Sequence, residues 1–206
     1  MGKGAQVTYS RNQLLEGTQW HFLRVRLARE ANITLHNHAV GGELVRQDIQ
    51  IECAEEGAQA TIQASACLPA GHILDQQLTV SHLAPNTTST QMIHNLVGSK
   101  AKAILNGRIY IEKGCDDTDA ELNNKNIALA DDAVINTKPE LEIYANEVRC
   151  AHGATIGMLD EAALFYCKSR GIDPEAARLL LCRAFLAQAT QGVLSANAMQ
   201  AYETAL

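Results

Sequence analysis

The sequence lacks the features that mark several large classes of protein. Lysine and arginine form no cluster and the formal net charge is −6, which argues against a nucleic-acid binder or a polybasic membrane patch. No apolar run approaches the roughly 20 residues that a membrane span needs. No apolar segment near the N-terminus resembles a secretion signal. We therefore expect a cytoplasmic protein that binds neither nucleic acid nor membrane.

Catalytic and redox motifs are also missing. The chain contains no P-loop, HExxH, GxSxG or dinucleotide-binding fingerprint, so we expect a protein without enzymatic activity of its own. Its six cysteines are scattered and form no CxxC pair. In a cytosolic chain such cysteines are reduced thiols, most of them buried.

Alternation of inward and outward residues dominates the chain from Thr18 to Ala145, as in half-buried strands. Turn residues interrupt this pattern every 13 to 17 positions, with no helical segment between them. Such spacing fits a sandwich, a barrel or a solenoid of stacked coils. Because aromatic residues make up only 4% of the chain and Asn and Thr recur, a narrow stacked interior is favoured over a sandwich. The alternating segments are HFLRVRLARE, NITLHNHAV, LVRQDIQIEC, AQATIQASACL, LDQQLTVSHL, KAILNGRIYIE and ELEIYANEV, and the turn markers are Gly42, Gly57, Gly71, Pro85-Asn86, Gly98, Gly114, Asp131-Asp132 and Asn146.

Helical patterns replace the alternation after Gly157. LDEAALFYCKSR predicts an amphipathic helix with Asp160 as N-cap and Gly171 as its end. DPEAARLLLCRAFLAQ predicts a second helix with Asp173 as N-cap and Pro174 in the first turn. SANAMQAYETAL predicts a weaker third helix capped by Ser195. These patterns divide the chain into an N-terminal segment (1–17), a β core (18–157) and a C-terminal helical region (158–206).

Cys150 and His152 are the most interesting polar pair in the chain. They lie at positions i and i+2, so on a strand both side chains face the same way. Two such ligands could contribute to a zinc, copper(I) or iron–sulfur site. A structural zinc ion needs four ligands, however, and a buried thiol beside an ordinary histidine fits the same pattern.

The other histidines and the acidic segment have simpler interpretations. His36 and His38 share the same spacing, but LHNHA indicates an exposed turn. A coil repeat could bring His72, His82 and His94 together. Cys115 lies in an acidic turn, where neighbouring carboxylates would raise the pKa of its thiol.

One family matches these segments. NTKPELEIYANEVRCAHGATIG, followed by LDEAALFYCKSRGIDPEAARLLLCRAF, resembles the C-terminal half of the SufB/SufD family of iron–sulfur cluster assembly proteins, and the likeness extends from about Gly41 to Leu186. The resemblance implies a right-handed parallel β-helix followed by a helical region. It also implies a SufB–SufD heterodimer as scaffold, and a SufC-like ABC ATPase that binds the helical region.

The resemblance favours the SufD branch. Aligning Thr137-Lys138-Pro139 with the Thr-x-Pro of SufB places Ala133 where SufB has a cysteine, and C-x-H-G-A-T is the SufD form. The resemblance then implies that His152, supported by Cys150, faces a nascent cluster shared transiently with the SufB-like partner, with no stably bound cofactor. It implies that Leu159 to Gln188 docks the ATPase. The partner-binding residues expected there are Asp160, Phe165, Tyr166, Arg170, Asp173, Pro174, Arg178, Arg183 and Phe185.

Several alternatives stay open. The chain is short for a SufD protein, which leaves Thr18 to Leu35 at an open end of the solenoid. A carbohydrate-active β-helix enzyme and a stand-alone metal-binding protein that uses the histidines are the competing functions. The sequence does not decide the cluster type, or between a heterodimer and a homodimer.

Overall fold

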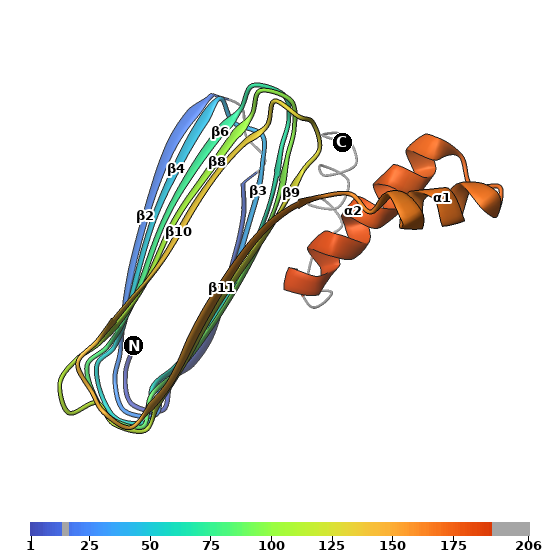
Figure 1. Ribbon diagram of the computed structural model, residues 1–206. Helices are drawn as coiled ribbons and strands as arrows, with labels where there is room; N and C mark the ends of the chain where they lie inside the picture. Colours follow the sequence, from blue (N-terminus) through green and yellow to red (C-terminus); the bar gives the residue numbers. More distant parts are fainter. Residues whose placement is uncertain (14–16, 191–206) are drawn as a thin grey trace.

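The computed structural model describes residues 1–13 and 17–190, which form a stack of coils with two helices on one side (Figure 1). Six strands form one parallel sheet in the order β1-β3-β5-β7-β9-β11, called sheet A here, and five form a second in the order β10-β8-β6-β4-β2, called sheet B. The bounds are β1 Gln6–Gln13, β2 Thr18–Leu27, β3 Asn32–Val40, β4 Leu44–Cys53, β5 Gln59–Leu68, β6 Ile73–His82, β7 Thr88–Val97, β8 Lys102–Ile111, β9 Thr118–Ala128, β10 Val134–Ile143 and β11 Val148–Met158.

Consecutive strands alternate between the two sheets, so each coil contributes one strand to each. Paired residues in adjacent coils lie between 26 positions apart, as for Thr18 and Leu44, and 32 positions apart, as for Lys102 and Val134. The turn markers 13 to 17 residues apart therefore each correspond to half a coil. The predicted β-solenoid followed by helices is confirmed, and the sandwich and barrel are ruled out. The solenoid also extends further toward the N-terminus than Thr18, because β1 pairs with β3.

Aliphatic side chains fill most of the space between the sheets. Leu35 and Ile62 of sheet A pack with Ile49, Ile51 and Leu78 of sheet B in one buried cluster. Each such side chain stabilises the fold by about 1.5–3 kcal/mol through burial. Two further buried clusters lie between the sheets, one that includes Leu68, Leu74 and Val97 and one that includes Ile109, Ile111 and Leu122.

Asparagine side chains connect the coils inside the solenoid. The Asn95 amide donates to Asn126 Oδ1 at 2.9 Å, and the Asn126 amide donates to Asn124 Oδ1 at 2.6 Å. All three side chains are buried, and these bonds satisfy part of their hydrogen-bonding capacity. The recurrence of Asn in the sequence thus reflects ladders between coils.

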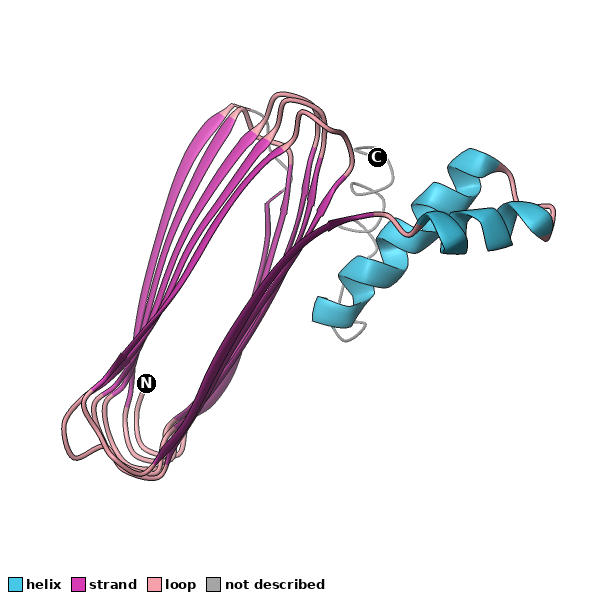
Figure 2. Ribbon diagram, viewed as in Figure 1, coloured by secondary structure: helices cyan, strands magenta, loops and turns pink. Residues whose placement is uncertain are grey.

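Helix α2 (Pro174–Thr190) lies against the outer side of sheet A, and α1 (Glu161–Ser169) packs on α2 and points away from the strands (Figure 2). Helix α1 starts at Asp160, whose side chain accepts from Ala162 N, and the chain turns at Gly171, which has φ +81°. Helix α2 starts after Asp173, whose Oδ1 accepts from Glu175 N at 3.0 Å. Both predicted caps are confirmed, and the third helix predicted at Ser195 lies outside the described residues.

The prediction of an exposed turn at His36 and His38 is wrong. Both residues lie within strand β3, where His36 is 5% and His38 1% exposed. Asn37 between them also lies within β3. Its side chain points to the interior, where its amide donates to Gln47 Oε1 at 2.8 Å. The second half of β3 is buried on both faces, so the histidines are buried on the outer side of sheet A.

Candidate functional site

Strand β11 forms one edge of sheet A at the end of the stack. Among the described residues it pairs only with β9, so one row of its backbone N–H and C=O groups has no strand partner. In Figure 1 it is the front strand of the sheet. The edge strand carries both residues of the Cys150–His152 pair.

The pair faces the inner side of this last coil. Cys150 stacks on Ala120 and His152 stacks on Leu122, and both of these partners are buried in the core. Cys150 is half-buried against the same cluster, whereas His152 is exposed because no strand stacks beyond β11 in the described chain. The imidazole therefore lies at the open end of the stack, where a second molecule can reach it.

The chemistry of the two side chains differs. Burial, and secondarily the negative charge of Asp119, raises the pKa of the Cys150 thiol, which keeps it protonated at neutral pH and makes it a weak ligand. An accessible imidazole needs no such activation to offer a nitrogen lone pair. Of the pair, His152 therefore has the more accessible donor atom.

The described residues contain no complete metal site. No group of three or more His, Cys, Asp and Glu side chains among them is arranged to hold an ion. His82 bonds Thr87 and Ser89, while His94 bonds the Phe185 carbonyl oxygen at 2.8 Å. The predicted approach of His72, His82 and His94 is therefore not seen, and the remaining ligands of any cluster at His152 would have to come from elsewhere.

The predicted partner-binding residues fall into two groups, one half-buried on α2 and one exposed. Phe185 stacks on the His94 ring with centroids 4.6 Å apart, and Arg178 donates to the Leu129 carbonyl oxygen at 2.9 Å, so both hold α2 against the sheet. Arg183 is half-buried on the same helix. The other six, which are exposed, are Asp160, Phe165, Tyr166, Arg170, Asp173 and Pro174.

Several large apolar side chains at the end of β11, on the two helices and between them are exposed. Phe165 and Tyr166 on α1 are 73% and 59% exposed. Met158, Ile172 and Leu180, which the sequence analysis did not single out, are 61%, 36% and 48% exposed. Exposed large apolar side chains of this kind occur at protein interaction sites when they lie together. Their spacing alone could not identify them, since it does not say which helix face meets the sheet.

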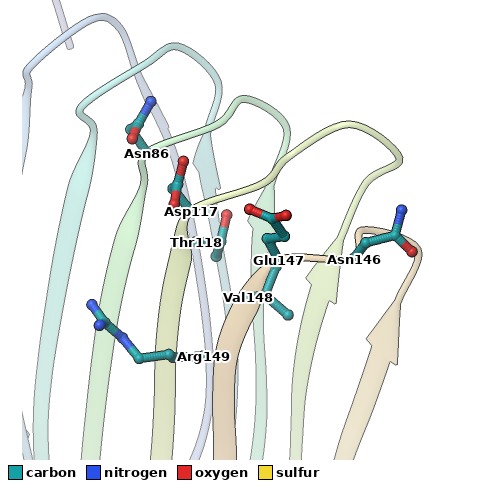
Figure 3. Close-up of a pocket in the computed structure, with 7 residues that line it drawn as sticks. All are labelled: Asn86, Asp117, Thr118, Asn146, Glu147, Val148 and Arg149. Carbon is teal, nitrogen blue, oxygen red and sulfur yellow. The ribbon is translucent and has the colours of Figure 1, made fainter.

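A second feature near β11 is an open concavity of about 650 Å³ at a corner of the coils (Figure 3). Its side chains come from the turns before β7, β9 and β11, such as Asn86, Asp117 and Glu147, and from the first residues of β9 and β11, such as Arg149. Arg149 pairs with Asp119 at 3.0 Å. Backbone hydrogen bonds join the turns, from Asn86 N to the Asp116 carbonyl oxygen at 3.0 Å and from Asp117 N to the Glu147 carbonyl oxygen at 2.7 Å.

Below this corner, Cys115 is nearly inaccessible. Its side chain is 2% exposed, and burial raises its pKa more than the neighbouring carboxylates do. Asp116 Oδ1 accepts from Asn146 N at 3.2 Å, which joins two successive turns. The predicted acidic turn therefore has a structural role in part.

Comparison with known proteins finds a family model and relatives whose descriptions name iron–sulfur cluster assembly. A family model described as "SUF system FeS cluster assembly, SufBD core domain" matches residues 1–185. An iron-sulfur cluster assembly SufBD family protein of Synechocystis is 33% identical over 90% of the chain and 41% of its own length. The iron-sulfur cluster assembly protein SufD of Escherichia coli is 31% identical over 81% of the chain and 40% of its own length. The chain thus spans less than half of these relatives.

Proposed function

Because the chain belongs to the SufBD core family of iron–sulfur cluster assembly proteins, we propose that it acts as a SufD-like scaffold subunit without catalytic activity of its own. Its partners are a SufB-like subunit and a SufC-like ATPase. The iron–sulfur cluster is its cargo, formed transiently between subunits. The observation that carries this proposal is the exposed His152 on the open edge strand β11.

The edge strand explains how a second subunit would complete the site. A strand from a SufB-like partner can pair with the free edge of β11, as edge strands commonly do. That pairing would bring the partner's side chains beside His152. Thiolates from the partner and the neutral imidazole together match the ligands that iron–sulfur clusters take.

The exposed helices provide a surface for the ATPase. Phe165 and Tyr166 lie on α1, which follows β11 after a short connection. On α2, Cys182 and Leu186 pack against sheet A in one buried cluster. A movement of the helices driven by ATP hydrolysis would therefore act on the same sheet that carries His152.

The competing carbohydrate-active function has little support. Such enzymes use paired carboxylates as acid and nucleophile or base. On the outer face of sheet B, however, Asp48, Glu52 and Asp75 are held by arginines at 2.5–3.0 Å. A stand-alone histidine metal site likewise lacks a set of three ligands among the described residues.

The test is co-expression of the full chain with a SufB-like and a SufC-like subunit, followed by purification of the complex and measurement of bound iron and sulfide. We expect His152→Ala to retain both partners but lower the iron content at least severalfold. Thr155→Ala is the matched control, since Thr155 is exposed on the same strand but faces the other way. Equal iron content in the His152→Ala and wild-type complexes would contradict the assigned role.

Partner docking is tested separately. Ile156 is 55% exposed on the inner side of β11, so Ile156→Asp is expected to abolish binding of the SufB-like subunit. Val134→Asp, at a similarly exposed position on sheet B (44%), should leave it intact. If both variants bind the partner normally, the β11 edge is not the interface.

A further inference from the structure

One chain presents half of a tetrahedral metal site on β11. Cys150 and His152 lie two positions apart on the inner side of the strand, stacked on the buried Ala120 and Leu122. Among the described residues, no group of three His, Cys, Asp and Glu side chains forms around them. A structural zinc ion takes four ligands, and two cysteines with two histidines are one of its usual sets. The missing ligands are thus a second cysteine and a second histidine.

The free edge of β11 can pair with the same strand of a second copy. In a two-fold dimer the same surface of both copies meets, so the two strands would run antiparallel. Side chains that point inward in one copy must then lie opposite inward side chains of the other, because a slip of one residue turns every side chain to the wrong face. The two-fold axis therefore passes through a residue of β11, not between two residues.

An axis at Ala151 brings all four ligands together. Cys150 of each copy then lies opposite His152 of the other copy on the inner side, and the paired segment runs from Val148 to Ala154. Opposite residues in an antiparallel pair have Cβ atoms about 4.5–5.5 Å apart, and diagonal residues about 7–8 Å apart. Because zinc binds sulfur and nitrogen at about 2.0–2.3 Å, one ion between the two strands is within reach of both pairs.

The charges of the paired segment allow this contact. Arg149 is the one Lys, Arg, Asp or Glu residue between Val148 and Ala154. The axis at Ala151 places it opposite Gly153 instead of opposite the same arginine, so like charges do not meet across the two strands. Its guanidinium also keeps its own partner, Asp119, at 3.0 Å.

The surroundings of the four ligands are apolar and uncharged. Cys150 packs against a buried cluster with Leu141 and Val148. Across the interior, a Cβ atom at Gly107 would lie 2.5 Å from Leu122 Cδ1, so these two positions face each other. One coil further the same positions are Pro139 and His152, so an uncharged side chain faces the imidazole. Such a setting resembles the closed environment of structural zinc sites.

We propose that, without a SufB-like subunit, two copies of this chain pair through β11 and bind one Zn²⁺ ion with two Cys150 thiolates and two His152 imidazoles. Zinc removes the proton of a coordinating thiol, which offsets the raised pKa of Cys150. The dimer uses the same edge strand as the function proposed above but does not require that function. A SufB-like subunit and a second copy would compete for this edge.

The purified full chain, without partners, provides the first test. Size-exclusion chromatography with light scattering measures its mass with Zn²⁺ and after removal of zinc with EDTA, and elemental analysis measures the bound metal. We expect a dimer that holds one zinc ion per two chains and a monomer after chelation. Co²⁺ in place of Zn²⁺ should give the visible absorption of a tetrahedral site with thiolate ligands.

Variants of the ligands make that test specific. His152→Ala and Cys150→Ser each remove two of the four ligands, so we expect the affinity for zinc to fall at least about 100-fold and the dimer to be lost. His72→Ala is the matched control, because His72 is half-buried in the turn before β6, far along the chain from β11. It should keep both the ion and the dimer. Circular dichroism confirms that each variant folds.

A crosslinking experiment tests the register. Residue 151 of each copy lies opposite itself, at a Cα separation of about 4.5–5.5 Å that a disulfide can bridge. With Zn²⁺ and a mild oxidant, Ala151→Cys is therefore expected to form a disulfide between chains, measured by non-reducing electrophoresis. Gly153→Cys is the control, because its two copies would lie four residues apart along the strands, about 13 Å.

Three results would overturn the proposal. One is the absence of zinc binding, or one ion per chain in a monomer. Another is a dimer that survives both EDTA and His152→Ala. The third is crosslinking of Gly153→Cys but not of Ala151→Cys. Normal iron content in a His152→Ala complex with a SufB-like subunit would count against the function proposed above alone, because the zinc dimer is measured without that subunit.

Discussion

The outer faces of the two sheets follow different rules although their inner faces are built alike. Along β6 in sheet B, buried and half-buried residues alternate strictly. Along β5 in sheet A, the alternation stops after Ile62 and every later residue is buried. The cause is α2, which contacts β5 and β7. Strict alternation therefore marks a face in contact with water, and its loss marks a face that another element covers.

The side chains on the two faces differ accordingly. The outer face of sheet A, called the covered face here, presents Val40, Cys67 and Leu96 to α2. The bare face, the outer face of sheet B, presents ion pairs such as those of Arg46 with Asp48 on the same strand and with Asp75 on the neighbouring strand. Burial of apolar surface stabilises far more per residue than exposed ion pairs do. Helix α2 thus belongs to the structural core of sheet A.

The strongest way to break this difference is to remove an apolar contact under α2. Leu186 is 1% exposed between α2 and sheet A, so Leu186→Ala should destabilise the protein by about 2–5 kcal/mol through the cavity it leaves. Urea unfolding followed by circular dichroism measures this change.

Two alanine variants serve as controls for that experiment. Leu180→Ala changes the same helix at a position that is 48% exposed, and Ile104→Ala changes the outer face of sheet B. Both should cost about 1 kcal/mol or less. Equal losses at all three positions would show that α2 does not stabilise the sheet through this contact.

Acid should weaken the covered face first. Burial lowers the pKa of His38, on the outer side of sheet A, to about 4, and it also lowers the pKa of His94 beneath α2. A histidine with a lowered folded-state pKa binds its proton more readily when unfolded. Stability is therefore complete above the unfolded pKa of about 6.5 and is lost as the pH falls toward 4. We expect roughly 1–3 kcal/mol from His38, measured by urea unfolding at several pH values.

The bare face should respond only at lower pH. Hydrogen bonding to Arg46 lowers the pKa of Asp48 below its usual value of 3.8, so its contribution is lost as the pH falls through that lowered pKa. His38→Gln should reduce the pH dependence between 6.5 and 4 without abolishing it, because burial also lowers the pKa of His82 to about 4 and the pKa of His94; the loss below 4 should not change. An unchanged slope in that upper interval would show that His38 does not cause it.

The smallest effect is expected on the bare face at neutral pH. Arg46 is 40% exposed and contacts both Asp48 and Asp75, so Asp75→Asn should cost about 0.2–1 kcal/mol. Added salt should reduce this cost because it screens exposed charges. Thermal unfolding at low and high salt measures both values, and a cost above about 2 kcal/mol would place this pair with the buried contacts.

The core-facing positions of the strands explain why most of the β-solenoid could be predicted from the sequence. Segments such as Leu44–Cys53 alternate cleanly because one face meets the core and the other meets water. Strand β9 was harder to identify, since its inward positions include Asn124 and Asn126, which pair in ladders that a hydrophobic pattern cannot show. The turn at residues 144–147 also divides a segment that the sequence presents as one strand, ELEIYANEV.

Burial on the outer side of sheet A could not be predicted from the sequence. His36 and His38 were assigned to an exposed turn because strand periodicity contains no information about α2 or about any element that packs on the outer side. For the candidate site, the shared direction of Cys150 and His152 followed from their spacing. The exposure of His152 did not, because it depends on β11 being the edge strand.

The regular register between coils has a further consequence for evolution. Each strand pairs only with its immediate neighbours, so a duplication or loss of one repeat would leave the residues at both ends of the stack unchanged. The distance between the first coil and His152 on β11 would then change in steps of about 4.8 Å, the spacing between adjacent strands. The length of the stack can thus vary by whole coils without any change in the residues of β11.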